Sequence, residues 1–139
     1  MIYNTIYTRL QKIGVTNKLL NREGEMSAKS KVTSFMDLNF DLLLTEFDIT
    51  TKEVVHHDIA LSHYYKMNGD MIADPDMVIR IYPDRKMAEA MTYQDLFGYK
   101  VVYNSNGSYS FAEKQNQNTF LAQWLNNLNI QGHSFEEGF

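Results

Sequence analysis

The sequence predicts an α+β fold, an antiparallel meander sheet of about five to six strands with an N-terminal and a C-terminal helix. Three observations predict it. Apolar residues recur at helical spacing near both ends of the chain and at every second position from Met36 onward. The segments between the extended runs are too short for the crossover helix that parallel strands require. With 139 residues the chain has the usual length of one domain, so we expect a single domain over residues 1–139.

The amino-acid composition excludes several classes of protein and of functional site. Hydrophobic residues make up 44% of the chain and charged residues 22%, which is typical of globular proteins. The chain has no cysteine, which excludes disulfide frameworks, thiolate zinc sites and cysteine nucleophiles and fits a reducing compartment. The first residues lack a secretory h-region, and no run approaches the roughly 20 apolar residues of a membrane span. We therefore expect a cytoplasmic protein without membrane association.

Residues 1–20 are predicted to form the N-terminal helix. Ile2, Ile6, Leu10 and Ile13 recur at steps of four, four and three residues and make one apolar stripe. Gly14 is a natural helix end, although residues 18–20 could add another turn. Residues 21–34 show no periodicity and few apolar side chains, so we expect a loose polar connector there.

Period-two patterns and β-prone composition predict the first strands of a sheet over residues 35–114. Apolar residues alternate with Asp37, Asn39 and Asp41 from Met36 to Leu44, and residues 53–65 are rich in β-branched and aromatic side chains. In the short run that Pro83 ends, Met77, Ile79 and Ile81 occupy every second position. In an extended chain this alternation puts the apolar set on one face of the sheet. The inward-facing sets are Met36, Leu38, Phe40, Leu42 and Leu44 in the first strand and Met77, Ile79 and Ile81 in the third.

Residues 86–93 are ambiguous between strand and helix. Their alanine, glutamate and methionine residues favour a helix locally. The turn at residues 83–85 is short, however, and suits a hairpin that returns to pair with the preceding strand. We predict a fourth strand.

The rest of the chain predicts a terminal hairpin and a helix. Two β-prone runs, residues 98–103 and 108–113, flank the turn-rich tetrapeptide Asn104–Gly107. The C-terminal helix is predicted over residues 117–130, with Asn118 as its N-cap and Gly132 as its end. Its apolar stripe consists of Phe120, Leu121, Trp124, Leu125 and Leu128.

Charge is unevenly distributed along the chain. Residues 1–34 carry six Lys or Arg and two Glu, a net charge of +4, whereas residues 35–139 carry seven basic and fifteen acidic residues, a net charge of −8. An acidic body repels phosphate backbones, so the composition disfavours nucleic acid as a partner. Any nucleic-acid binding would depend on the N-terminal basic residues, which are Arg9, Lys12, Lys18, Arg22, Lys29 and Lys31.

The densest group of polar side chains lies between the second and third predicted strands. Asn68-Gly69 is the favoured pair for a turn in which both central residues have positive φ, and Asp74 before Pro75 is a common turn start, so the group could be purely structural. It is also the best candidate for a binding surface, because tyrosines and fixed carboxylates suit protein recognition. The candidate binding residues are His63, Tyr64, Tyr65, Asn68, Asp70, Asp74, Asp76 and Arg80.

An alternative interpretation of this group is a metal site. His63, Asp70, Asp74 and Asp76 could converge on Mg²⁺ or Mn²⁺ and activate water, with Arg80 stabilising negative charge. Their spacing matches no EF-hand. The sequence also lacks a glycine-rich phosphate loop, a G-x-S-x-G elbow and an H-E-x-x-H pair, so no catalytic set is complete and no cofactor is indicated.

Three stretches carry a resemblance to a known family. They are the block from His63 to Met77 with its His-Tyr-Tyr-x-x-Asn-Gly-Asp and Asp-Pro-Asp elements, residues 92–95, and the ending from Trp124 to Gly132. The chain beyond about Phe35 resembles a family of uncharacterised bacterial and phage domains that are common on plasmids, phages and conjugative elements. The chain departs from that family at His133, where an aromatic residue is expected. The resemblance implies an accessory protein of a mobile genetic element and implies no catalytic residues.

Taken together, these features predict a non-catalytic protein-binding module that presents its acidic, tyrosine-rich face to a basic partner. Two alternatives stay open at this point. One is a small metal-dependent hydrolase or nuclease that uses Asp70, Asp74 and Asp76. The other is nucleic-acid binding through the basic N-terminal segment.

Overall fold

A meander of six antiparallel strands is the centre of the computed structural model, which describes residues 1–20 and 27–135. Each strand pairs with the next one along the chain, in the order β1 to β6. This confirms the predicted fold class, and it confirms residues 87–93 as part of a strand, whereas Lys86 lies in the turn before it. The strands are β1 Ser27–Ser30, β2 Leu38–Phe47, β3 Val54–Met67, β4 Asp70–Tyr82, β5 Met87–Asp95 and β6 Gly98–Val101.

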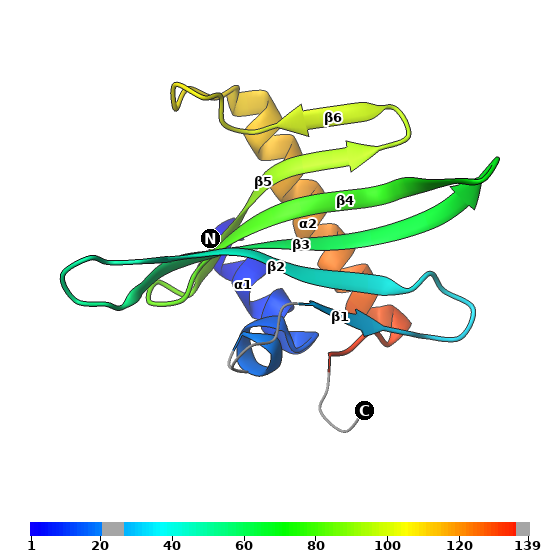
Figure 1. Cartoon of the computed structure of the whole chain (residues 1–139), viewed down its shortest axis with the longest axis horizontal. Coiled ribbons are helices and arrows are strands. Elements are labelled where there is room, and N and C mark those ends of the chain that lie inside the picture. The colour runs from blue at the N-terminus through cyan, green and yellow to red at the C-terminus, as the bar shows by residue number, and fades with distance from the viewer. Residues whose placement is uncertain (21–26, 136–139) are drawn as a thin grey trace.

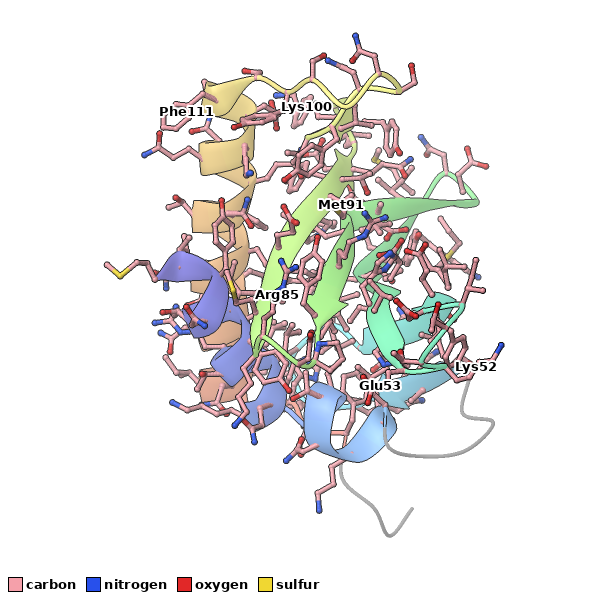
Figure 2. The ribbon with its side chains drawn as sticks, turned by 90° about the vertical axis from the view of Figure 1, so that its left-hand side faces the viewer. Lys52, Glu53, Arg85, Met91, Lys100 and Phe111 are labelled. Carbon is pink, nitrogen blue, oxygen red and sulfur yellow. The ribbon has the colours of Figure 1, made fainter. Side chains whose placement is uncertain are left out.

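Two α-helices cover one face of this sheet. Helix α1, Ile2–Lys12, and helix α2, Phe111–Gln131, pack against each other and lie behind the strands in Figure 1. Figure 2 shows both helices on one side of the strands. A short π-helix η1, Val15–Leu19, follows α1. The face of the sheet opposite α1 and α2, called the open face below, carries no helix of the described residues.

The core lies between the sheet and the two helices. It contains Ile6 and Leu10 of α1, the buried stripe of α2 and the inward-facing residues of β2 to β5. Burial of each such Leu or Ile side chain contributes about 1.5–3 kcal/mol. The period-two pattern read from the sequence matches the burial of most of the sheet: Phe40, Ile59, Leu61, Met77, Ile79, Ile81, Ala88 and Ala90 all point inward. The prediction is wrong for Met36 and Leu44: Met36 precedes β2 and is 39% exposed, and Leu44 follows a register shift in β2 and is 51% exposed.

Helix α2 begins earlier than the sequence analysis predicts. Its N-cap is Ser110, whose hydroxyl accepts a hydrogen bond from the Glu113 backbone N–H at 3.3 Å, so the prediction of Asn118 as the N-cap is wrong. Residues 108–113 accordingly form no strand, and only an isolated bridge between Tyr103 and Tyr109 remains of the predicted terminal hairpin. Ser110 and Glu113 stand three residues apart, which is the spacing of a helix N-terminus, and that local signal outweighs the β-propensity of the segment.

The N-terminal region also differs from its prediction. Gly14, with φ +94°, separates α1 from η1, and the backbone of Phe135 lies where a Cβ at this position would be. The predicted connector contains strand β1, which pairs with β2, while residues 21–26 of that connector lie outside the described residues. No helix of the described ranges is long and apolar enough to cross a membrane.

Candidate functional site

The open face carries a continuous set of polar side chains, because residues paired across antiparallel strands point to the same side of the sheet. One row joins Asn39, Ser62 and Asp76, on β2, β3 and β4. A second row joins Asp58 of β3, Arg80 of β4 and Glu89 of β5, and Glu46 pairs with His56 beside it. The alternation that buries Leu61 and Met77 thus also determines which side chains the open face presents.

A groove of about 530 Å³ lies on the open face over β1 to β4. The Tyr64 hydroxyl donates a hydrogen bond to Asp76 Oδ2 inside it. Burial, this bond, and the negative charges of Asp76 and Asp41 raise the pKa of Tyr64 to about 12. The groove is lined by Ser27, Ala28, Lys29, Asn39, Phe40, Asp41, Ser62, Tyr64, Met71 and Asp76.

Beside the groove an ion pair crosses from β3 to β4. Arg80 donates from Nε to Asp58 Oδ1 at 2.8 Å and from Nη2 to Asp58 Oδ2 at 3.0 Å. The bond to Asp58 raises the pKa of Arg80 above its ordinary value. His56, 5% exposed, continues the network: its Nε2 lies 2.6 Å from Glu46 Oε2 and its Nδ1 lies 3.4 Å from Asp58 Oδ1. Arg80 is therefore already held by the protein's own carboxylate.

A third cluster surrounds Glu89 at the β5 side. Tyr82 and Tyr103 each donate a hydroxyl hydrogen bond to its carboxylate. The Lys114 ammonium lies over the ring of Tyr103 at 5.2 Å and that of Tyr109 at 4.6 Å. Its hydrogen bond to Tyr103 raises the pKa of Lys114. The cluster ties helix α2 to the segment after β6, and sequence reasoning missed it because Glu89, Tyr103 and Lys114 are far apart in the chain.

The structure brings only part of the predicted set together. Tyr64, Asp76 and Arg80 share the open face. The turn is also shorter than predicted: Asn68 and Gly69, with φ +53° and +88°, form all of it, so the residues from Asp70 to Arg80 belong to strand β4. Asp70 and Asp74 are exposed, and Tyr65 is half-buried.

His63 lies on the helix-covered side of the sheet. It is 5% exposed, its Nδ1 is 2.8 Å from the Asp37 carbonyl oxygen, and its ring packs edge-on against Trp124 at 5.6 Å. His63 and Asp76 therefore point away from each other, and no group of three His, Asp or Glu side chains in the described part of the chain could hold a metal ion. The geometry gives the metal-site alternative no ligand set.

Three of the N-terminal basic residues, Arg9, Lys29 and Lys31, have separate surroundings in the structure. Arg9 donates to the Ala122 carbonyl oxygen of α2 at 2.7 Å, and Lys31 lies 3.9 Å from Asp37. Lys29 belongs to the groove. Arg22 lies outside the described residues. The nucleic-acid alternative gains no geometric support from these positions.

A buried polar contact holds β1 to the residues after α2, and sequence reasoning missed it. The Ser30 hydroxyl and His133 Nδ1 are 3.0 Å apart, and the Ser134 backbone N–H donates to the same hydroxyl at 3.0 Å. His133 is 2% exposed. Since β1 supplies one wall of the groove, this contact positions a part of the candidate site.

The stability of the fold should fall as the pH drops from 7.5 to 5.5. Burial and the neighbouring His63 lower the pKa of His133, and burial and His56 lower the pKa of His57. The unfolded chain then takes up protons below about pH 6.5 more readily than the folded chain, so this stability is present above that pH and is lost on acidification. Urea denaturation at both pH values measures the effect. His133→Asn, which keeps an acceptor for Ser30, should show a smaller decrease, and an unchanged decrease would contradict the assignment to His133.

Comparison with known proteins gives one match. A family model described as "Domain of unknown function (DUF6908)" matches residues 5–134, a range that contains every strand of the sheet, the groove and the contact between Ser30 and His133. No curated protein and no solved structure matches the chain.

Proposed function

The chain belongs to the domain family DUF6908, and from that premise and the geometry of the open face we propose that it is a non-catalytic protein-binding module that takes a basic partner. The family match agrees with the sequence-based resemblance to uncharacterised domains, and its description assigns no activity. The proposal therefore depends on the surface itself.

The observation that carries the proposal is a sheet face that is rich in acids and that no helix of the described residues covers. Arg80 neutralises Asp58. Asp41, Glu46, Asp76 and Glu89 have no ion pair with a Lys or Arg among the residues that the structure describes. Such a surface complements a positively charged partner.

The rim of the open face adds contact area suited to protein recognition. Leu44, Met71 and Tyr99 are 51%, 58% and 61% exposed. Tyrosine and methionine are enriched in protein interfaces. The hydroxyls of Tyr64, Tyr82 and Tyr103 are fixed by carboxylates, so these side chains lose little freedom when a partner binds.

We further propose the cytoplasm as the location and a mobile genetic element as the source of the gene. The absence of cysteine supports the first, and the resemblance of the block from His63 to Met77 supports the second.

A nona-lysine peptide labelled with a fluorophore tests the charge complementarity. Fluorescence anisotropy should show binding that weakens as salt rises. Asp41→Asn with Glu46→Gln should weaken binding about two- to thirtyfold, since each exposed charge pair contributes about 0.2–1 kcal/mol. A nona-glutamate peptide should not bind.

The matched control is Glu53→Gln with Asp84→Asn, which removes the same charge from two exposed positions between strands. It should weaken binding less than twofold. Equal losses in the two double variants would show that only net charge matters, and the proposal would fail.

A further inference from the structure

We propose that the groove on the open face is a seat for one arginine side chain of the bound partner. The inference rests on the proposed protein-binding function and specifies the residue that the open face selects. The supporting observation is the set of hydrogen-bond donors and acceptors that line the groove.

The groove offers more acceptors than donors. Asn39 donates from Nδ2 to the Ser62 carbonyl oxygen at 3.4 Å, which leaves its Oδ1 without a partner among the described residues. Asp76 receives the Tyr64 hydroxyl on Oδ2 only, and the Asp41 carboxylate makes no hydrogen bond or ion pair within the described part of the chain. A ligand that fills these sites must bring several donors.

Ser62 is an independent indication of a ligand. It is 3% exposed and lines the groove. No hydrogen bond joins its hydroxyl to another described residue, because the contact with Asn39 uses the Ser62 carbonyl oxygen. A donor or acceptor that enters the groove finds this hydroxyl available.

The charge of the groove selects a cation. Asp76, Asp41 and Tyr64 all line the groove, and the negative charges of both carboxylates act on the Tyr64 hydroxyl. Among the described residues of the lining the single cation is Lys29, which is exposed and belongs to the edge strand β1. A positive group in the groove would be stabilised by both carboxylates, and by the tyrosine ring if it lies over the ring face.

A guanidinium group matches the acceptors of the groove better than an ammonium group does. It carries five N–H donors in a planar fork, whereas ammonium carries three donors on a compact, strongly hydrated charge. The acceptors of the groove come from three strands, Asn39 and Asp41 on β2, Ser62 on β3 and Asp76 on β4. A planar group that bonds in several directions can reach more of them at once.

Three small probes test the seat in the full chain by ¹⁵N chemical-shift titration. N-acetyl-arginine methylamide should give saturable shifts at residues 39–41, 62–64 and 71–76. The lysine analogue should bind at least about fivefold more weakly. The citrulline analogue has nearly the shape of arginine without its charge, and it should give no saturable shift at these residues.

Variants of the residues that line the groove distinguish specific binding of arginine from nonspecific attraction between charges. Asp41→Asn and Asp76→Asn should each weaken arginine binding at least about fivefold, and Asn at position 76 can still accept the Tyr64 hydroxyl. Lys29→Gln removes the competing cation and should strengthen binding about twofold. Equal binding of the citrulline analogue, or shifts that ignore both aspartate variants, would overturn the seat.

Different results would contradict the proposed arginine site and the proposed protein-binding function. If nona-lysine binds the open face but arginine shifts no groove residue, the seat is wrong and the protein-binding proposal stands. If arginine occupies the groove but no basic peptide binds, the groove takes a small guanidinium compound and the protein-binding proposal fails.

Discussion

Gly14→Ala is expected to lower the free energy of unfolding by about 2–5 kcal/mol. The left-handed conformation, φ +94°, costs a residue with a Cβ about 1–2 kcal/mol. The added Cβ would also lie 2.8 Å from the carbonyl oxygen of Phe135, and displacing packed groups costs about 1–3 kcal/mol more. The obstacle is backbone, so no rotamer change relieves it. Urea denaturation followed by circular dichroism measures the loss.

Gly107→Ala is the matched control for this prediction. Gly107 has φ +86°, and no atom lies within 4 Å of the position that an added Cβ would take. The substitution therefore costs only the free energy of the left-handed backbone conformation. We expect Gly107→Ala to cost about 1–2 kcal/mol. Equal losses at the two glycines would show that the segment around Phe135 moves aside freely.

The effect of Gly14 should reach the groove through a short chain of contacts. Phe135 donates its backbone N–H to the Ile13 carbonyl oxygen at 2.8 Å, and its ring packs 6.0 Å from Phe40. Ser134 and His133, just before it, hold Ser30 of β1. Because β1 is one wall of the groove, displacing Phe135 should also weaken binding at the groove.

The sequence predicted the sheet because burial and alternation are local properties of each strand. Residues 86–93 show where local propensity alone misleads: Ala88 and Ala90 favour a helix, but both are fully buried once β5 pairs with β4. Asn118 shows the opposite error. It resembles an N-cap, yet its Oδ1 accepts the Ala90 backbone N–H at 2.8 Å, a long-range bond that no local pattern indicates.

The candidate site was harder to predict than the fold. Tyr64 and Asp76 are twelve residues apart, and they meet because of the pairing of β3 with β4 and the register shift between Ser62 and Tyr64. A shift of one residue reverses the face on which a side chain lies. The sequence therefore identified several of the polar residues of this region but grouped His63 with Asp76, although the two lie on opposite sides of the sheet.

Arg80→Met and Asp58→Leu are each expected to lower the free energy of unfolding by about 1–4 kcal/mol, because each leaves one charge without its partner on the open face. The side chains are 13% exposed at Asp58 and 30% exposed at Arg80, so the loss should be larger for Arg80→Met, which leaves the more buried charge. The double variant should cost about 1–3 kcal/mol less than the sum of the single variants. Urea denaturation of the four proteins gives this coupling energy.

The pair Lys31 and Asp37 supplies the control cycle, since its side chains are 74% and 41% exposed and 3.9 Å apart. Its coupling should stay below about 0.5 kcal/mol. A strong coupling at Arg80 means that this cation serves the sheet and is not free to hold a partner's carboxylate. The open face would then act toward a partner as an acidic surface, because its most central cation is already neutralised. A coupling energy near zero would mean that Arg80 is free to bind a partner. The open face would then present both a positive charge and negative charges.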